Sequence, residues 1–292
     1  MFQDTAPLAE RMRPKSLSDI IGQGHLVGDQ GILRKAIISG RIPSIIFWGP
    51  PGTGKTTLAN IIANEVKVPF HVLSAISAGV KDVREVIAKV SPGQKNILFI
   101  DEIHRFNKSQ QDALLGAVEK GKITLIGATT ENPSFEVNAA LLSRAQVYRL
   151  NSLTSEELNA IMMQAIEKDN TLKSYKITIK QTEAIFNLSG GDARKLLNLL
   201  EQVVTSQKSN KAVVTDALVM EVAQQKTVLY DKKGEMHYDI VSAFIKSIRG
   251  SDPNAAVYYL ARMIEGGEEV KFIARRLVIL AAEDIGNSNP TA

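Results

Sequence analysis

The feature that most constrains this chain is the segment Gly49-Pro50-Pro51-Gly52-Thr53-Gly54-Lys55-Thr56. An apolar run at residues 45–48 precedes it, and residues 57–63 after it have the spacing of an amphipathic helix. This order predicts a buried strand, a tight loop and a helix. The spacing G-x-x-x-x-G-K-T is that of a phosphate-binding loop. The alternative is a glycine-rich turn that matches the pattern by chance. Such a turn would have no reason to lie between a strand and a helix.

The residue types in this loop point to a nucleotide. Glycines at positions 49, 52 and 54 permit positive φ angles and a close approach of the backbone. Successive amides can then converge on a polyphosphate at the positive end of a helix. We expect Lys55 to reach the β- and γ-phosphates and Thr56 to hold Mg²⁺. The loop therefore predicts a nucleotide polyphosphate and Mg²⁺, bound by residues 49–56.

Two acidic residues at the end of a predicted strand supply the second half of this chemistry. The strand is predicted at residues 96–100, and Asp101 and Glu102 follow it at the rim where parallel sheets bind ligands. We expect Asp101 to hold the hydration shell of Mg²⁺ and Glu102 to orient and polarise the attacking water. Adjacent acids also occur at solvated strand ends, but downstream of a phosphate-binding loop the pair has a chemical purpose. His104 has two interpretations, a contact on the γ-phosphate side or a structural hydrogen bond.

A further strand, predicted at residues 123–128, brings Thr129 and Thr130 to the same edge. Thr130 is placed to hydrogen-bond the γ-phosphate or the attacking water, or alternatively to cap the turn before Pro133. Strand and helix signals alternate over residues 15–152. This alternation predicts a doubly wound, mainly parallel α/β sheet.

The character of the sequence changes near residue 152. Thr154 and Glu157 match a capping box, and beyond them strand signals nearly vanish. We expect a nucleotide-binding domain at residues 1–152, an all-helical lid at 153–230 and the start of a helical C-terminal domain at 231–292. A polar linker is predicted at residues 231–235. We expect the third domain to be incomplete.

Composition sets broad limits on the function. The 292 residues contain no cysteine, which excludes disulfides, cysteine zinc sites and thiol catalysis. No apolar run approaches the roughly 20 residues that span a bilayer, and the N-terminus lacks a signal-peptide pattern. We expect a cytoplasmic or nucleoid-associated protein with no membrane partner. The net charge of +4 permits nucleic-acid binding but does not require it, because a solvated basic surface also explains that charge.

In this order, the phosphate loop, the acidic pair, the threonine-bearing strand and the helical lid resemble the AAA+ ATPases, a class of P-loop NTPases. The resemblance covers residues 8–226 and makes residues 49–56 Walker A and the acidic pair Walker B. It also implies that Thr130 is sensor 1, Arg144 the arginine finger and Arg194 sensor 2. A finger acts on ATP held by a neighbouring subunit, so the resemblance implies an oligomer. Without these motifs, both arginines would be read as surface residues.

The closer resemblance is to the replication-associated recombination protein A family, which includes the Werner-helicase-interacting proteins. It rests on the segments DEIHRFNK at residues 101–108, GATTENPSF at 127–135 and AEDIG at 282–286. Residues 13–14 and 21–23 are similar to the adenine-side segment of clamp loaders and RuvB. The family resemblance implies a homotetrameric, DNA-dependent ATPase with a C-terminal oligomerisation domain. It implies action at stalled replication forks and single-strand gaps, association with single-strand-binding protein and, in some members, action on duplex ends.

Other interpretations remain open at this point. A protein unfoldase normally carries an aromatic pore loop, and residues 74–80 contain no aromatic residue. A clamp-loader subunit, a RuvB-like motor and an ATP-regulated recruitment platform are the alternatives. The lid residue Lys195 and the cluster Lys271, Arg275 and Arg276 are candidates for DNA contact, although a solvated basic face explains them as well.

Overall fold

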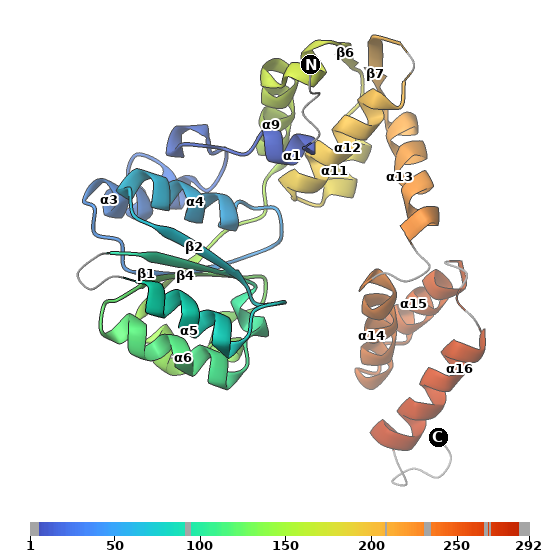
Figure 1. Ribbon diagram of the computed structural model, residues 1–292. Helices are drawn as coiled ribbons and strands as arrows, with labels where there is room; N and C mark the ends of the chain where they lie inside the picture. The colour runs from blue at the N-terminus through green and yellow to red at the C-terminus, as the bar shows by residue number, and fades with distance from the viewer. Residues whose placement is uncertain are drawn as a thin grey trace. The chain divides into compact units, whose positions relative to one another are not determined.

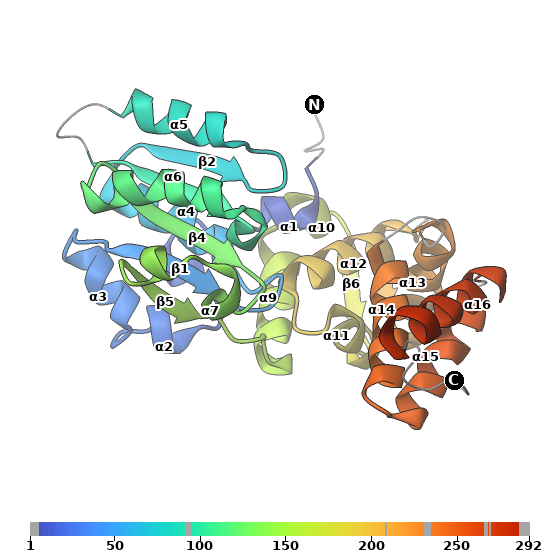
Figure 2. The same ribbon diagram turned by 90° about the horizontal axis from the view of Figure 1, so that it is seen from below.

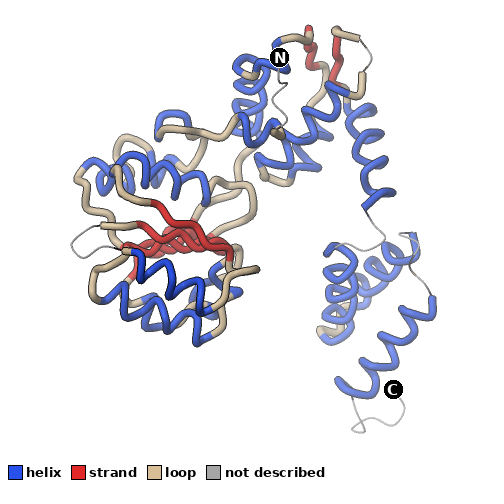
Figure 3. The backbone as a smooth tube through the Cα atoms, viewed as in Figure 1, coloured by secondary structure: helices blue, strands red, loops and turns tan. Residues whose placement is uncertain are grey.

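The computed structural model describes residues 6–90, 95–207, 209–230, 235–265, 268 and 270–285. The chain divides into two compact units, Met1–Met220 and Glu221–Ala292. The first unit holds a layered α/β sheet and a mainly helical lid segment, and the second is helical in its described residues (Figures 1 and 3). The domain boundaries predicted at residues 152 and 230 stay predictions.

Five parallel strands form the main sheet, in the order β2-β3-β4-β1-β5. They are β1 (Ser44–Trp48), β2 (Phe70–Ser74), β3 (Ile97–Asp101), β4 (Thr124–Thr129) and β5 (Ala145–Arg149). Figure 2 shows β2 and β5 at opposite edges. Trp48 pairs with Thr129, and Ser74 pairs with Asp101. Because the strands are parallel and in this register, the phosphate loop, the acidic pair and Thr130 all leave the sheet at the carboxyl ends of its strands. The predicted parallel sheet is confirmed.

Helices cover both faces of the sheet, with α3 and α4 on one face and α5 and α6 on the other (Figure 1). The helical elements before the lid are α1 (Leu8–Arg11), η1 (Leu17–Asp19), α2 (Gly24–Val27), α3 (Ile32–Ile38), α4 (Lys55–Val66), α5 (Val80–Lys89), η2 (Ile103–Arg105), α6 (Lys108–Glu119), α7 (Pro133–Glu136) and α8 (Ala139–Leu142). None of the helices in the described part of the chain is long and apolar enough to cross a bilayer.

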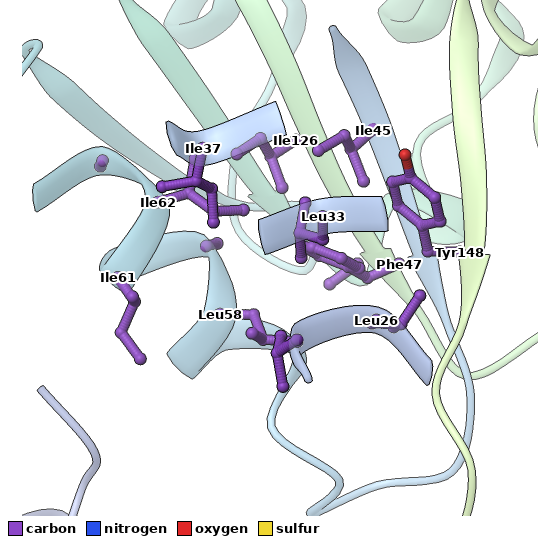
Figure 4. Close-up of a cluster of buried hydrophobic side chains, with 14 of the residues drawn as sticks. Leu26, Leu33, Ile37, Ile45, Phe47, Leu58, Ile61, Ile62, Ile126 and Tyr148 are labelled. Atoms are coloured by element: carbon purple, nitrogen blue, oxygen red, sulfur yellow. The ribbon is translucent and has the colours of Figure 1, made fainter. Parts of the chain in front are cut away.

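The core lies in two layers because alternate strand residues point to opposite faces. Ile45 and Phe47 of β1 pack with Leu33 and Leu58 of the covering helices (Figure 4). Ile46, between them, packs into the other layer, with residues of α5 and α6. Full burial of side chains of this size stabilises the fold by roughly 1.5–3 kcal/mol each. This packing holds the strand ends in fixed positions.

The lid is helical as expected, except for two short strands. Its helices are α9 (Ser155–Lys168), α10 (Asn170–Lys173), α11 (Glu183–Ser189), α12 (Ala193–Thr205) and the beginning of α13 (Asp216–Tyr230), and its strands are β6 (Lys176–Ile179) and β7 (Lys211–Val214). The two strands pair in parallel. The expectation of an all-helical lid missed them because four-residue runs carry little periodicity. The predicted capping box at Thr154 is confirmed, since its side chain accepts from the amide of Glu157.

The second unit packs helices around a small core of its own. It contains the end of α13 and the helices α14 (Glu235–Arg249), α15 (Pro253–Glu265), α16 (Val270–Ile279) and η3 (Leu280–Ile285). Val241, Phe244, Met263 and Ile273 are buried together. Of the predicted polar linker, residues 231–234 lie outside the described residues.

Candidate nucleotide-binding site

The phosphate loop connects β1 to α4 and opens toward solvent at Gly54. Gly52 and Gly54 have φ angles of 69° and 102°, which favour glycine. A Cβ atom on Gly54 would meet nothing within 4 Å. The hydroxyl of Thr53 donates to the carbonyl of Pro50 at 2.9 Å and braces the turn. The amides at the start of the 12-residue helix α4 are thereby held next to open space, where an anion can bind.

Lys55 holds its charge inside the loop. Its Nζ donates to the carbonyls of Gly49 and Pro50, each at 2.7 Å, and only 8% of the residue is exposed. Burial lowers the pKa of Lys55, while the carboxylates of Glu102 and Asp101 oppose the shift. The ammonium group therefore lies among electronegative groups at the carboxyl end of the sheet.

The acidic pair is presented at the end of β3 by a sharp change of backbone direction. Asp101 ends the strand, and Glu102 adopts a left-handed conformation with φ of 53°. The carboxylate Oε2 of Glu102 lies 3.5 Å from the hydroxyl of Thr130 and 3.2 Å from Nδ1 of His104. Two side chains from different elements therefore contact the same carboxylate oxygen.

His104 also contacts Thr129, which is fully buried. Nδ1 of His104 lies 3.0 Å from Oγ1 of Thr129, and the amide of Glu131 donates to the same hydroxyl oxygen at 3.0 Å. The structure thus shows the hydrogen-bonding role that the sequence left open for His104. It links the end of β4 to Glu102. The sequence placed Thr129 at this edge but gave it no partner.

The lid meets the phosphate loop at the start of α12. The side chain of Asp192 caps this helix by accepting from the amides of Arg194 and Lys195. The amide of Ala193 donates to the carbonyl of Gly52 at 3.3 Å. A Cβ atom on Gly52 would lie 1.8 Å from Oδ1 of Asp192, so the loop and the lid approach as closely as glycine allows. Arg194 follows at once and lines the same cavity as the loop.

A cavity of about 310 Å³ joins these parts. Its walls come from the N-terminal segment, the phosphate loop, the acidic pair and the lid helices α9 and α12. Its lining includes polar groups, such as Lys55 and Asp101, and apolar side chains, such as those of Ile21 and Leu197. Polar and apolar groups in one cavity suit a phosphate chain and a nucleobase. Arg13, Pro14 and Ile21 of the predicted adenine-side segment line it.

Comparisons with known proteins identify the family. The AAA family model, described as the ATPase family associated with various cellular activities, matches residues 45–153. Models of an AAA C-terminal domain and of the MgsA AAA+ ATPase C terminus match residues 171–249 and 250–292. The replication-associated recombination protein A of Coxiella burnetii is 48% identical over 99% of this chain and 67% of its own length. This chain belongs to the replication-associated recombination protein A family. It is an AAA+ ATPase.

Other relatives in this family agree. The Escherichia coli protein of the same name is 47% identical over 98% of the chain and 66% of its own length. ATPase WRNIP1 of Dictyostelium discoideum is 42% identical over 98% of the chain and 36% of its own length. The chain spans about two thirds of the length of the bacterial relatives. The solved structure of Thermotoga maritima RuvB, a Holliday junction branch migration motor, is 30% identical with a TM-score of 0.63, covering 82% of this chain and 80% of its own.

A divalent metal fits this ATPase at the carboxyl edge of the sheet. Thr56 and Asp101 both line the cavity and offer hard oxygen donors. No group of three or more His, Cys, Asp or Glu residues that could hold a metal occurs in the described ranges. Mg²⁺ needs no such cage, because it binds one or two protein oxygens together with phosphate and water. The residues present therefore suit Mg²⁺ bound with a nucleotide.

The N-terminal segment of this ATPase is tied to the lid by a network that no local signal indicated. Nε of Arg11 contacts Asp169 at 2.7 Å, and Nη1 contacts Glu201 at 2.8 Å. The amide of Leu8 donates to Glu201 at 2.9 Å. The side chains of Arg11 and Asp169 are only 9% and 4% exposed. Since the segment after Arg11 lines the cavity, this network joins one cavity wall to another.

Arg144, like Thr130, is not among the residues that line the cavity. It follows α8 and pairs with Glu119 at 2.6 Å, with 40% of its side chain exposed. Its Nη1 also donates to the carbonyl of Ala140 at 2.8 Å. The structure brings Lys55, Asp101, Glu102 and Arg194 together and links Thr130 to them through Glu102. Within one subunit Arg144 is not among them, so a role for it in catalysis requires a second subunit.

Proposed function

We propose that this ATPase hydrolyses ATP with Mg²⁺, and that DNA at stalled replication forks and single-strand gaps stimulates the hydrolysis. The observation that carries this proposal is the cavity in which the phosphate loop, the acidic pair and Arg194 meet. The name shared by the bacterial relatives, replication-associated recombination protein A, supports the DNA context. The net charge of +4 is compatible with binding to phosphates.

The phosphate loop, which lines one part of the cavity, would bind the triphosphate. The loop amides and Lys55 replace water around the phosphate oxygens, and a phosphate is a stronger acceptor than the carbonyls of Gly49 and Pro50 that Lys55 contacts at 2.7 Å. Thr56 and Asp101 would hold Mg²⁺, which offsets the negative charge of the β- and γ-phosphates when bound.

Hydrolysis would depend on Glu102. Its carboxylate orients a water molecule for attack on the γ-phosphorus and takes the proton that the water loses, while the bond to the bridging oxygen of ADP breaks. Thr130 and His104 hold that carboxylate at 3.5 Å and 3.2 Å. Arg194, carried on the lid, would stabilise charge on the transferred phosphoryl group. Arg144 would do the same from a neighbouring subunit.

The proposed partners follow from the same scheme. A finger that acts on a neighbour requires assembly, and we propose a homotetramer. We also propose association with single-strand-binding protein, because a gap presents both the strand and that protein. Lys195 on the lid and Lys271, Arg275 and Arg276 on α16 are the proposed contacts for DNA phosphates.

A RuvB-like motor is the second candidate, and the structural similarity to RuvB favours it. We expect such a motor to carry a winged-helix DNA-binding domain after the lid. The described residues of the second unit form helices and no strand, so they offer no β-ribbon for a wing. A recruitment platform is the third candidate. It would keep its function in a Glu102→Gln variant, which should bind ATP without turnover.

The deciding experiment is steady-state ATP hydrolysis with no DNA, single strands, blunt duplex, gapped duplex, forked duplex and a four-way junction. Glu102→Gln is the blank for contaminating activity. Stimulation by forks and gaps above the other DNAs is the expected result. Preference for the four-way junction would favour the RuvB-like candidate, and hydrolysis indifferent to every DNA would overturn the DNA-dependent proposal.

DNA binding by this ATPase should be directed to phosphates and largely independent of sequence. Affinity for a forked duplex should fall by about tenfold or more between 50 and 200 mM salt, because each phosphate contact releases counterions. Fluorescence anisotropy on forks of two unrelated sequences measures both properties. A salt-independent affinity, or a strong preference for one sequence, would contradict phosphate-directed binding.

A further inference from the structure

Two exposed basic residues, Arg105 and Lys108, follow the acidic pair, and we call them the basic pair. Arg105 ends the short helix η2, and Lys108 begins α6. Neither forms an ion pair with another residue that the structure describes. By contrast, Arg11, Arg13 and Arg144 all contact carboxylates. Exposed basic side chains are common, so the surroundings of the basic pair have to decide what it can bind.

The basic pair lies at the same end of the sheet as the nucleotide site. α5 and α6 follow the parallel strands β2 and β3, so both helices begin at the carboxyl ends of the strands, and they pack against each other. The side chain of Gln110 in α6 donates to the carbonyl of Ala78, just before α5, at 2.9 Å. Lys81, in the first turn of α5, pairs with Glu85 only loosely, at 3.9 Å, and 88% of its side chain is exposed. Positive charge from two adjoining helix starts therefore borders the end of the sheet where ATP would be hydrolysed.

A single turn of backbone connects the basic pair to Glu102. The amide of Arg105 donates to the carbonyl of Glu102 at 2.9 Å and closes the turn. Ile103 and Phe106, which are 0% and 2% exposed, anchor the turn in the core. Between them, His104 contacts the carboxylate of Glu102 at 3.2 Å, while Arg105 is exposed. A ligand that holds Arg105 therefore holds the same turn that places His104 against the carboxylate.

We propose that the basic pair binds phosphates of the DNA backbone, and that this contact raises the rate of hydrolysis by ordering the turn that positions Glu102. The inference rests on the proposed DNA-stimulated ATPase and names the contact through which DNA acts. Arginine and lysine bind phosphate through charge-assisted hydrogen bonds, and such contacts carry no sequence information. DNA can order the turn only as far as it binds one arrangement of the turn better than the others. Loss of the contact should therefore change turnover as well as affinity.

The test measures DNA binding and DNA stimulation separately in the double variant Arg105→Gln/Lys108→Gln. Fluorescence anisotropy on a forked duplex gives the affinity at several salt concentrations. The slope of log affinity against log salt should become shallower by about 1.8, since each phosphate contact contributes about 0.9. With enough DNA to saturate each protein, the ratio of ATP hydrolysis rates with and without DNA should fall by about fivefold or more. Thermal melting checks folding, and each single variant, with about half the change in slope, keeps the test available if the double variant does not fold.

The control is Arg41→Gln/Lys120→Gln, which removes the same charge at the opposite end of the sheet. Arg41 precedes β1, Lys120 follows α6, and both are exposed. This variant should keep the wild-type slope and the wild-type stimulation. Equal changes in the two double variants would overturn the proposal, because net charge and not the basic pair would then matter.

The proposal requires both changes in the variant of the basic pair. A shallower slope with unchanged stimulation would overturn it, because the contact would then bind DNA without regulating hydrolysis. Reduced stimulation with an unchanged slope would overturn it as well, because the basic pair would then not contact phosphates. If the wild type is stimulated by DNA and the variant equally so, only this inference fails. A wild type whose hydrolysis ignores every DNA would overturn the proposed DNA dependence, and this inference with it.

Discussion

Glu102 is one of four non-glycine residues with a positive φ angle in the part of the chain that the structure describes. A non-glycine residue with φ of 53° costs about 1–2 kcal/mol, and such conformations persist where the surrounding contacts enforce them. Here the contacts come from Thr130 and His104, which hold the carboxylate at the sheet edge. The direction of the Glu102 carboxylate therefore depends on the side chains of Thr130 and His104 as well as on the backbone of Glu102.

His104 should act as a positioning residue for Glu102. Replacing His104 with Ala removes the group 3.2 Å from the carboxylate, so kcat should fall between about tenfold and a hundredfold while KM for ATP stays within twofold. His104→Asn, whose amide nitrogen lies near the position of Nδ1, should recover part of the rate. Steady-state kinetics measure both, with thermal melting as a check on folding. Equal rates for Ala and Asn variants, together with lowered melting temperatures, would indicate a purely structural histidine.

At the scale of elements, the contact between the phosphate loop and α12 decides whether the cavity closes. Gly52→Ala would place a Cβ atom 1.8 Å from Oδ1 of Asp192, so loop and lid must separate. Affinity for ADP should fall by about tenfold or more, because a shift of about an ångström misplaces the binding groups. Titration calorimetry measures the change.

Gly40→Ala is the matched control for this substitution. Gly40 has φ of 65°, close to the 69° of Gly52, yet its Cβ atom would meet nothing within 4 Å. Both variants carry the same backbone strain, but only Gly52→Ala crowds the lid. Equal losses of ADP affinity in the two variants would show that strain alone, and not the contact with the lid, weakens binding.

The tie between α1 and the lid should contribute strongly to stability. Arg11→Met leaves the buried carboxylate of Asp169 without its partner, which costs about 3–5 kcal/mol. Arg13→Met breaks only an exposed pair with Glu10 and should cost about 0–1 kcal/mol. Urea unfolding of both variants measures the difference. Equal and small losses would mean that the Arg11 network adds no net stability.

The same tie should weaken in acid. Burial alone would raise the pKa of Asp169, but hydrogen bonds from Arg11 and from the amides of α10 outweigh it, and the net pKa is lowered. The pKa of an aspartate in the unfolded protein is about 3.9, and the pKa of Asp169 in the folded protein is lower. The charged carboxylate therefore stabilises the folded protein fully at pH values above about 3.9, and this stabilisation is lost as the pH falls through the pKa of the folded state. The stability gap between wild type and Asp169→Asn should therefore be largest at neutral pH and shrink below about pH 4. A gap independent of pH would contradict the charged contact.

At the scale of the whole molecule, a single subunit does not complete the proposed site. Arg144 pairs with Glu119 outside the cavity, so Arg144→Ala should leave ADP binding unchanged and lower the hydrolysis rate of the assembled protein by about 10³-fold or more. Arg144→Ala and Glu102→Gln should each be inactive alone. When the two variants are mixed, part of the wild-type rate should return. In mixed oligomers the Arg144 of a Glu102→Gln subunit can act on the nucleotide site of an Arg144→Ala subunit, which retains Glu102. Absence of complementation in mixed oligomers would place Arg144 outside the reaction.

Much of the site follows from local sequence. The phosphate loop, the acidic pair at the end of β3 and the cap of α9 depend on residues within a few positions of one another. Their geometry is set by backbone preferences and short hydrogen bonds, so spacing alone predicts them. The three central strands β1, β3 and β4 were also predictable, because they are buried and read as short apolar runs.

Tertiary structure alone decided the rest. The contact of Arg11 with Asp169 joins positions 158 residues apart, and the approach of Gly52 to Asp192 likewise depends on packing between distant elements. The strands β6 and β7 pair with each other in parallel although Lys176 and its partner Lys211 are far apart in the sequence. Such contacts leave no periodic signal, since each partner is also an ordinary helix or loop residue in its own surroundings. Local sequence identifies the chemical groups at the carboxyl ends of the strands, and packing between distant elements sets which of those groups touch.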